Sequence, residues 1–440
     1  MRLPPAIVGH TEEVLREILR FTGPADGTLS RYFREHPRLG SRERGVIAEA
    51  IYGLLRNKSV YTSFSESGVG PVMRRLSLLG LADAVGIDAL GGLSEEETNW
   101  LQRVMEMDRS HLPLQLKSNM PDWLWQRLAA NFGEEEALQL VASLNSPASL
   151  DLRVNTLKSN RETVAASLAE APIIAEPTPY AATGLRVVKK PSIQNLPLFK
   201  DGTIEVQDEG SQILAQLVGA KRGEMVADFC AGAGGKTLAL GAIMRNTGRL
   251  YAFDISEKRL AKLKPRLARS GLSNVHPVVI AHERDAKIKR LAGKLDRVLV
   301  DAPCSGLGTL RRNPDVKWRQ NEKGVAELNE KQASILDSAA RLVKAGGRLV
   351  YATCSILDEE NEGIVQQFLT NHPDFELLPA SQVLQEQKIE LEMGDYLKLY
   401  PHRHHTDGFF AAVMQRKKAS AKDAAKDGTV AKETKDAQDA

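Results

Sequence analysis

Cysteine is scarce in this chain, and that scarcity excludes two classes of protein. The 440 residues contain three cysteines, Cys230, Cys304 and Cys354, and none of them forms a C-x-x-C pair. A disulfide framework needs many paired cysteines, and a structural zinc site needs clustered thiol or imidazole ligands. The sequence therefore predicts neither, and it favours a reducing, cytoplasmic location.

Long apolar runs and a strong excess of one charge are also absent. No stretch approaches the roughly 18 uncharged apolar residues of a membrane span, and residues 1–10 lack the sustained apolar core of a signal peptide. Lys and Arg total 59 against 56 Asp and Glu, so the net charge of +3 does not by itself indicate a nucleic-acid partner. We expect no membrane partner, and any basic surface must be local.

The hydrophobic pattern divides the chain into four regions. Helical spacing of apolar residues predicts an all-helical domain over residues 1–110. Residues 111–200 are predicted to form a helical linker and a small α+β module. In residues 201–416 strands and helices alternate regularly, which predicts an α/β domain with a mostly parallel, doubly wound sheet. Residues 417–440, which alternate Lys, Asp and Ala, are predicted to be disordered.

Within the α/β region the expected elements can be placed more closely. The expected strands cover residues 225–229, 249–253, 275–280, 295–300 and 348–352. A single helix is expected over residues 257–269, and the apolar runs 396–400 and 409–414 are expected to form a terminal antiparallel hairpin.

Two of the three cysteines come directly after apolar strands. Cys304 and Cys354 lie 50 residues apart, each just past a strand end. Ligands collect at the carboxyl ends of strands in an open α/β sheet, so the two thiols can face one pocket. A free cysteine is most often a small buried hydrophobe, and we keep that interpretation for Cys230. For Cys304 and Cys354 the strand-end position, with Asp301 and Pro303 nearby, favours catalysis.

A glycine-rich loop follows the first strand of this region and opens a helix. It reads Asp228-Phe229-Cys230-Ala231-Gly232-Ala233-Gly234-Gly235-Lys236-Thr237. Glycines let the backbone approach a ligand closely, and Asp254 at the next strand end can accept hydrogen bonds from ribose hydroxyls. Together they favour a nucleoside cofactor. The loop also ends like a P-loop, but Cys230 occupies the position of the first glycine, which disfavours an ATPase.

Two short segments resemble motifs IV and VI of the RNA cytosine-5 methyltransferases that use S-adenosylmethionine. They are Asp301-Ala302-Pro303-Cys304-Ser305 and Thr353-Cys354-Ser355. The segments 207–212 and 311–318 resemble the bacterial 16S ribosomal RNA branch, the Sun/Fmu family, whose members carry a NusB-like helical domain in front. The resemblance implies a Rossmann-like class I methyltransferase domain behind an all-α NusB-like domain.

The resemblance also implies roles for single residues. Cys354 would attack C6 of a cytosine, because C5 is a poor nucleophile until a bond at C6 turns the ring into an enamine. Cys304 would assist release of the product, and Asp301 would hydrogen-bond near the cytosine N3 or the cofactor. The implied S-adenosylmethionine site comprises Cys230, Ala231, Gly232, Ala233, Gly234, Gly235, Lys236, Asp254 and Asp301, with Glu283 or Asp285 as a further acid.

The cofactor loop departs from the family pattern at two positions. The usual loop reads Cys-Ala-Ala-Pro-Gly-Gly-Lys-Thr, whereas Gly232 and Ala233 stand here in place of the second alanine and the proline. Loss of the proline raises the flexibility of the free loop.

Cytosine chemistry requires an unpaired or flipped base, so surfaces that bind RNA are expected. Three sets of side chains are candidates, each with a structural alternative: Arg34, Arg38, Arg42, Arg44, Arg56 and Lys58; Arg153, Asn155 and Lys158; and Arg311, Arg312, Lys317 and Trp318. The third set combines basic groups with an aromatic that could stack a base, although Trp318 could equally belong to the core.

The predicted function is methylation of cytosine C5 in RNA, with 16S ribosomal RNA as the expected substrate and no obligate protein partner. No metal is expected at His402, His404 and His405, because methyl transfer from a sulfonium requires none. Three alternatives remain open: transfer RNA as the substrate, a P-loop NTPase, and a non-catalytic RNA-binding assembly factor.

Overall fold

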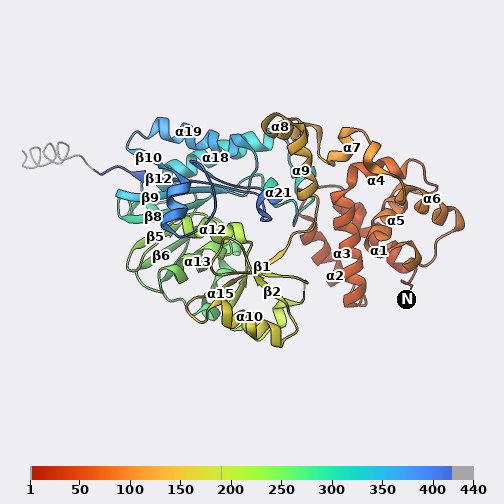
Figure 1. Cartoon of the computed structure of the whole chain (residues 1–440), viewed down its shortest axis with the longest axis horizontal. Helices are drawn as coiled ribbons and strands as arrows, with labels where there is room; N and C mark the ends of the chain where they lie inside the picture. Colours follow the sequence, from red (N-terminus) through yellow and green to blue (C-terminus); the bar gives the residue numbers. More distant parts are fainter. Residues whose placement is uncertain (1, 190, 419–440) are drawn as a thin grey trace, which may run out of the picture.

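The computed structural model describes residues 2–189 and 191–418. Figure 1 shows the N-terminal helices at one end of an elongated molecule, a large covered sheet at the other end, and a small α+β module beside that sheet. The disordered tail predicted for residues 417–440 lies, from residue 419 on, outside the described residues. Lys417 is still attached to the fold, because its backbone N–H donates to Asp374 O at 2.8 Å.

Helices make up the N-terminal part of the chain. They are α1 (Ala6–Ile18), α2 (Ala25–Glu35), α3 (Ser41–Arg56), α4 (Lys58–Ser65), α5 (Val72–Val85), α6 (Glu95–Met105), α7 (Leu114–Ser118), α8 (Asp122–Phe132) and α9 (Glu134–Leu144), with short 3₁₀ turns η1 (Ile87–Ala89) and η2 (Arg109–His111). In α3, Ile47, Ile51 and Leu54 recur at helical spacing and are buried in the core of this part, which explains why the helix forms there.

The small module is an antiparallel sheet with one covering helix. Its elements are β1 (Leu150–Val154), α10 (Arg161–Glu170), β2 (Ala175–Pro177), β3 (Gly184–Val187), η3 (Ile193–Asn195), α11 (Pro197–Lys200) and β4 (Ile204–Val206), in the strand order β2-β3-β1-β4. Strand β4 belongs to this sheet although it lies beyond residue 200, where we expected the module to end. The chain thus passes from the module directly into the large α/β region.

The large sheet has the strand order β10-β12-β9-β8-β5-β6-β7, with β11 paired to β12. Its strands are β5 (Met225–Asp228), β6 (Arg249–Asp254), β7 (Val275–Val279), β8 (Leu295–Asp301), β9 (Val343–Thr353), β10 (Phe375–Leu378), β11 (Leu397–Leu399) and β12 (Phe409–Arg416). Strands β5 to β9 are parallel, and β12 is antiparallel to β9, β10 and β11.

The helices and short turns of this region connect and cover the strands. They are α12 (Glu209–Leu217), α13 (Gly235–Ile243), α14 (Glu257–Ala261), α15 (Leu263–Ser270), α16 (Ala286–Lys289), η4 (Leu307–Thr309), α17 (Val316–Arg319), α18 (Glu322–Ala340), η5 (Asp358–Glu360), α19 (Glu362–Asn371), α20 (Ala380–Glu386) and α21 (Pro401–His404). No helix among the described residues combines the length and apolar character needed to cross a bilayer.

Two details of this region differ from the prediction. The terminal hairpin is present as β11 and β12, but β12 also pairs with β9 and β10 and therefore lies inside the sheet. The single helix expected over residues 257–269 is two helices, α14 and α15, separated at Lys262. Pro265 explains the break, because it cannot donate a backbone N–H and its ring collides with the carbonyl four residues earlier.

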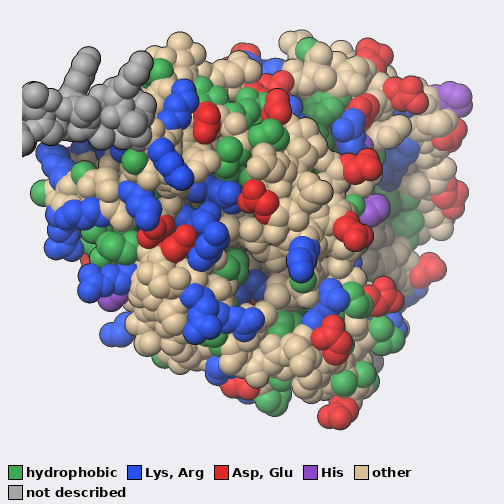
Figure 2. All heavy atoms as spheres, turned by 60° about the vertical axis from the view of Figure 1, so that its left-hand side comes forward, with side chains coloured by type: hydrophobic (Ala, Val, Ile, Leu, Met, Phe, Trp, Pro, Cys, Tyr) green, Lys and Arg blue, Asp and Glu red, His purple; other side chains and the backbone are tan. Residues whose placement is uncertain are grey.

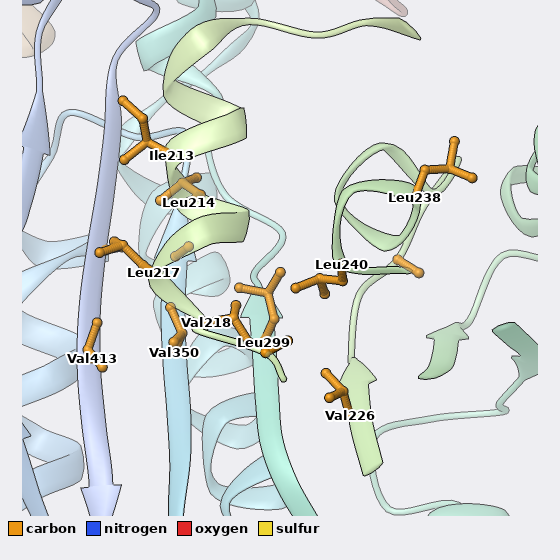
Figure 3. Close-up of a cluster of buried hydrophobic side chains, with 14 of the residues drawn as sticks. Ile213, Leu214, Leu217, Val218, Val226, Leu238, Leu240, Leu299, Val350 and Val413 are labelled. Atoms are coloured by element: carbon orange, nitrogen blue, oxygen red, sulfur yellow. The ribbon is translucent and has the colours of Figure 1, made fainter. Parts of the chain in front are cut away.

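One face of the sheet is covered by α12 (Figure 3). Ile213 and Leu217 point from this helix toward β12, and Val218 at its end lies beside Leu299 of β8. These four side chains share one cluster with Val350 of β9 and Val413 of β12, and all six have 0% exposure. Burial of one such side chain stabilises the fold by about 1.5–3 kcal/mol. This packing fixes the relative positions of the strands whose carboxyl ends carry the site.

The linker helices α8 and α9 pack against the catalytic region as well. Leu128 of α8 and Leu140 of α9 share one buried cluster with Leu307 and Leu357. Leu307 follows β8 and Leu357 follows β9, so these helices cover the segments that come after the two cysteines.

Candidate active site

A cavity of about 900 Å³ opens at the carboxyl ends of β5, β6, β7, β8 and β9. Most of the predicted site residues line it, namely Cys230, Ala231, Gly232, Ala233, Gly235, Lys236, Asp254, Glu283, Asp301, Cys304 and Cys354. Gly234 and Asp285 do not. Because ligands collect at the carboxyl ends of parallel strands, residues from five separate stretches of sequence surround one space.

The two predicted catalytic thiols are neighbours in this cavity. The Sγ atoms of Cys304 and Cys354 lie 3.4 Å apart, and both cysteines are free. Strands β8 and β9 are adjacent and parallel, so the residues after their ends meet. The backbone N–H of Gly308 donates to Cys354 O at 2.9 Å. A Cβ at Gly308 would lie 2.1 Å from Gly408 O, so only glycine permits this approach.

The electrostatic surroundings of the thiols are not symmetric. The hydrogen bond with Cys354 and burial raise the pKa of Cys304 well above its ordinary value. Lys236 Nζ donates to Asp301 Oδ2 at 2.8 Å. Burial lowers the pKa of Lys236, but the charge of Asp301 and this hydrogen bond outweigh burial and leave that pKa raised, with Cys354 also interacting with the ammonium. A persistent cation therefore lies beside Cys354.

The glycine loop is held by the carboxylate at the end of β6. Asp254 is 2% exposed, and its oxygens accept from the backbone N–H groups of Gly232 at 2.8 Å and Ser256 at 2.7 Å. Gly232 has φ +56°, a left-handed conformation that favours glycine over the alanine of the usual loop. Arg266 Nη1 donates to Ala233 O at 2.6 Å. These bonds order a loop that its sequence alone predicts to be more flexible.

The two candidate acids after β7 differ in position. Glu283 lines the cavity, and Ser334 Oγ donates to its Oε1 at 2.7 Å, a bond that lowers the pKa of Glu283. Asp285 caps helix α16 instead, because its carboxylate accepts from the N–H groups of Ala281 and Lys287, each at 2.8 Å. Of the two, Glu283 alone can reach a ligand in the cavity.

Two further groups at the end of β5 have raised pKa values. Asp228, at the end of β5, is 1% exposed, and burial raises its pKa from 3.8 to about 7. Thr237 Oγ1 donates to Asp228 Oδ2 at 2.7 Å, whereas Oδ1 has no hydrogen-bond partner among the described residues. Burial also raises the pKa of Cys230, which suits the structural role expected for this thiol.

Several cavity residues carry no sequence signal that we recognised. Arg266 and Arg269 of α15 both bind the carboxylate of Glu205 in β4, with the Arg266 Nη2 to Oε2 distance at 2.9 Å. They join the small module to α15, and Arg266 lines the cavity. Arg259, His282 and Lys331 also line the cavity, as do Gln207, Asp208 and Ser211 of the segment 207–212 on which the family resemblance rests in part. Only the spacing of Arg266 and Arg269 on one helix face could have indicated a shared partner.

The members of the segment after motif IV that were predicted to contact RNA have protein partners, and of the four only Lys317 is buried and therefore wrong as an RNA contact. Lys317 is fully buried, and its Nζ donates to Arg56 O at 3.0 Å. Trp318 Nε1 donates to Leu55 O at 2.8 Å, so both side chains bind the last carbonyls of α3. Arg311 donates to backbone carbonyls of His405 and Thr406.

Arg312 is the member of that segment which lines the cavity. Its Nη2 donates to Asp208 Oδ2 at 2.9 Å, and its Nε donates to Asp407. Both acids are buried, and the single positive charge of the guanidinium pairs with both of them. Its charge is thus committed to two carboxylates and not to a phosphate.

Two of the three candidate RNA contacts in the small module also have structural roles. Arg153 is 5% exposed and donates to Gln207 Oε1 at 2.6 Å, and burial lowers its pKa to about 10. Asn155 is buried and donates to Gly202 O and Ser270 O, which joins the module to the catalytic region. Lys158 is exposed, so this set retains one side chain that RNA can reach.

The basic set of the helical region is divided between surface and interior. Arg34, Arg38 and Arg42 are exposed, whereas burial lowers the pKa of Arg56 and of Lys58. Arg44 donates to Leu39 O and Pro37 O. The three exposed arginines remain candidates for phosphate contact.

The histidines before β12 have protein partners. His402 Nε2 lies 3.0 Å from Glu136 Oε1, and His404 Nδ1 accepts from the N–H of Tyr400 at 3.0 Å. Among the described residues, the grouping with metal-ligand spacing is a different one, His10, Glu13 and His36, which lies in the helical part.

The cavity has the features that a nucleoside-containing cofactor needs. A Cβ at Gly232 would meet nothing within 4 Å, so the loop backbone faces open space. Asp254 presents a carboxylate for ribose hydroxyls, and Ile255 and Ile280 add apolar surface for a base. With a parallel sheet that ends in an inserted antiparallel strand, this is the fold and site of a Rossmann-like methyltransferase that uses S-adenosylmethionine.

Comparison with known proteins defines the family. Residues 215–415 match the family described as 16S rRNA methyltransferase RsmB/F, and residues 120–194 match the ferredoxin-like domain of RsmF/B-like methyltransferases. The chain is 33% identical to the "Probable ribosomal RNA small subunit methyltransferase B" of Synechocystis sp., over 92% of this chain and 98% of that protein. It is 32% identical to ribosomal RNA small subunit methyltransferase B of Yersinia pseudotuberculosis, over 79% of this chain and 75% of that protein.

Solved structures agree. A methyltransferase homolog protein from Pyrococcus horikoshii is 31% identical, with a TM-score of 0.60 over 70% of this chain and 100% of that chain. The chain therefore belongs to the RsmB/F family and is an RNA methyltransferase that depends on S-adenosylmethionine. The predicted α/β class and cofactor are confirmed, and the P-loop alternative is excluded.

Proposed function

We propose that this protein methylates C5 of a cytosine in 16S ribosomal RNA through a covalent bond between Cys354 and cytosine C6. The observation that carries the proposal is the pair of thiols, with Sγ atoms 3.4 Å apart, in the cavity lined by the cofactor loop. One thiol alone would be enough to form the adduct. A second thiol in contact with it supports a two-step reaction, in which the adduct must also be resolved.

The residues divide the work as follows. Cys354 attacks C6, and the Lys236 cation beside it stabilises the negative charge of the attacking thiolate. Attack makes C5 nucleophilic, and S-adenosylmethionine supplies the electrophilic methyl group. Elimination then passes the C5 proton to water, re-forms the C5–C6 double bond and expels Cys354 as a thiolate. The hydrogen bond with Cys354 and burial raise the pKa of Cys304, so Cys304 carries a proton that it can donate to the departing Cys354 thiolate.

Asp301 orients the reacting groups. Its carboxylate is fixed by Lys236 Nζ, and it lies in the same short segment as Cys304. A carboxylate there can hydrogen-bond near the cytosine N3 or to the cofactor. Glu283 and Asp254 are the acids placed to contact the cofactor from the ends of β7 and β6.

The RNA substrate is expected to contact a basic face of the catalytic end. In Figure 2, Lys and Arg side chains gather in the left half of the face, and Asp and Glu side chains are more frequent toward the right edge. We assign the N-terminal helices the role of a NusB-like RNA-binding domain, with Arg34, Arg38 and Arg42 exposed on it. The names of the relatives, ribosomal RNA small subunit methyltransferase B, support 16S ribosomal RNA.

Bisulfite sequencing of total RNA tests reaction and substrate together. Cells that carry the wild-type protein should show one protected cytosine in 16S ribosomal RNA that is lost with Cys354→Ala. Glu362→Gln is the control, because Glu362 binds Lys398 and lies outside the cavity lining, and it should retain protection. Loss of protection in a transfer RNA instead would leave the chemistry standing and replace the substrate. No change in any RNA would reject the proposal in favour of a non-catalytic RNA-binding role.

A further inference from the structure

A single buried carboxylate joins the segments that carry the two thiols. Glu360, in the turn η5 after β9, is 0% exposed. Its Oε1 accepts from the backbone N–H of Ser305 at 2.8 Å, and its Oε2 accepts from the hydroxyls of Ser305 and Ser355. Ser305 follows Cys304 directly and Ser355 follows Cys354 directly, so the same carboxylate binds both neighbours of the thiol pair.

The carboxylate is itself fixed from the protein side. Gln332 of α18 donates through Nε2 to Glu360 Oε1 at 3.0 Å and to Pro303 O at 3.0 Å. Tyr351 of β9 donates through its hydroxyl to the Glu360 backbone carbonyl at 2.7 Å. Glu360 lies outside the cavity lining, so it does not touch the substrate or cofactor. Its contacts lead to the thiols by way of the residues beside them.

We propose that Glu360 is a positioning residue that holds Cys304 and Cys354 in contact and so sets the rate of adduct resolution. The proposal rests on the proposed cytosine-5 reaction for its catalytic consequence, but its geometric part does not. Neither strand end alone fixes the other, since β8 and β9 end before the cysteines. The hydroxyls of Ser305 and Ser355, 3.2 Å apart, both turn toward one oxygen, and this common partner gives the two segments a shared reference point.

The charge of Glu360 has a second effect, on Cys304. After the bond to Cys354 and burial, Glu360 contributes to the raised pKa of Cys304. The carboxylate thus favours the thiol form of the residue assigned to release, while Lys236 lies beside the residue assigned to attack.

The rate of cross-linking between the thiols tests the geometric part without RNA. Diamide accepts the two electrons and two protons that two thiols give up on forming a disulfide, and mass spectrometry of the non-reduced protein follows the Cys304–Cys354 bond. Glu360→Gln removes the charge and replaces one acceptor oxygen by a donor. We expect it to slow cross-linking roughly 10-fold, because small displacements of reacting atoms cost large factors in rate. Glu362→Gln is the matched control, since Glu362 binds Lys398 and not the cysteine segments, and it should cross-link like the wild type.

The steady-state rate of RNA methylation tests the catalytic part of the proposal. Glu360→Gln should lower kcat roughly 10- to 100-fold, while KM for S-adenosylmethionine stays within about twofold of the wild type. If Glu360→Gln fails to fold, the double variant Ser305→Ala, Ser355→Ala replaces it, because it removes both hydroxyl donors and keeps the carboxylate. Cross-linking and kcat at wild-type rates in a folded variant would overturn the proposal. Failure of the wild type to methylate RNA would reject the proposed function instead, and the cross-linking result would still decide the positioning role.

Discussion

The cofactor loop and the thiol segments are each held by a buried carboxylate, but the two carboxylates differ in how many hydrogen bonds they accept. An ionised carboxylate offers about four lone-pair sites. Asp254 accepts from Gly232 N, Ser256 N and Arg259 Nη2, which leaves one site toward the cavity. Glu360 accepts from four donors, those of Ser305, Ser355 and Gln332, and none of its sites remains.

This difference separates binding from chemistry. A carboxylate with a free site at the cavity wall can exchange protein contacts for ligand contacts, so changes to it should alter cofactor affinity. A saturated carboxylate away from the cavity can act only through the residues that it holds, so changes to it should alter the rate of the chemical step. The predictions below test this division, from the largest expected effect to the smallest.

Removal of the Cys304 thiol should give the largest effect, and it should lower the rate of the chemical step without changing cofactor affinity. Cys304→Ala leaves Cys354 free to attack but removes the group assigned to release, so turnover should fall roughly 100-fold or more. The RNA should then remain attached to the protein, visible as a slow band on denaturing gels. Glu362→Gln, at a carboxylate that binds Lys398 outside the cavity, should show normal turnover and no band. If Cys304→Ala formed no adduct, the division of labour between the two thiols would be wrong.

Asp228 extends the comparison to a carboxylate with a single donor. Its folded pKa is raised from 3.8 to about 7 by burial, so the protonated form is favoured in the folded state. The stability that this group contributes is therefore full below about pH 4 and is lost as the pH rises through 7. The loss is on the order of a few kcal/mol.

Asp228→Asn, which cannot ionise, should remove that loss. The difference in unfolding free energy between the wild type and Asp228→Asn, measured in urea at pH 5 and at pH 8, should shift in favour of the variant at the higher pH. The comparison within each pH cancels the other titrating groups. Parallel pH profiles would show that Asp228 remains ionised in the fold.

The smallest effect is expected on the binding side. Asp254→Asn removes one charge from the acid with a free site, and charged hydrogen bonds contribute about 1.5–3 kcal/mol, so S-adenosylmethionine should bind roughly 10- to 100-fold more weakly. At saturating cofactor the turnover should be close to normal. Isothermal titration calorimetry measures the affinity, and Asp285→Asn, which alters a helix cap outside the cavity, should leave it unchanged. A loss of kcat at saturating cofactor would show that Asp254 affects the chemical step as well as cofactor binding, contrary to the division proposed above.

The parts of the site that follow strand ends could be predicted from the sequence. Asp254, Asp301, Cys304 and Cys354 are all located by an apolar run and its end, and parallel strands bring such ends to one edge. The family motifs then added their chemistry. Glu360 has no such marker, because it lies in a turn past β9 and its partners come from α18 and from the end of β8.

Local pattern failed where one sequence suits two environments. Lys317 and Trp318 combine charge with an aromatic ring, as an RNA-binding surface does, yet they lie between domains, where the carbonyls of α3 satisfy their donors. At Lys262 the helix is broken because of Pro265, whose effect outweighs the helical spacing of the apolar residues around it. Partners that are distant in the sequence, such as Arg56 O for Lys317, cannot be predicted from the local pattern of residues.

The attachment of α17 to the end of α3 has a consequence for any RNA that touches both ends of the molecule. Segment 305–319 begins beside Cys304 and ends on the N-terminal helices, so a short, hydrogen-bonded path joins the reactive thiol to the distant domain. The spacing between those two contact points is then a property of the protein. Under the proposed function, an RNA that the helices bind has to present its cytosine at that fixed separation, and we expect its three-dimensional shape, more than the bases around the cytosine, to decide whether it is methylated.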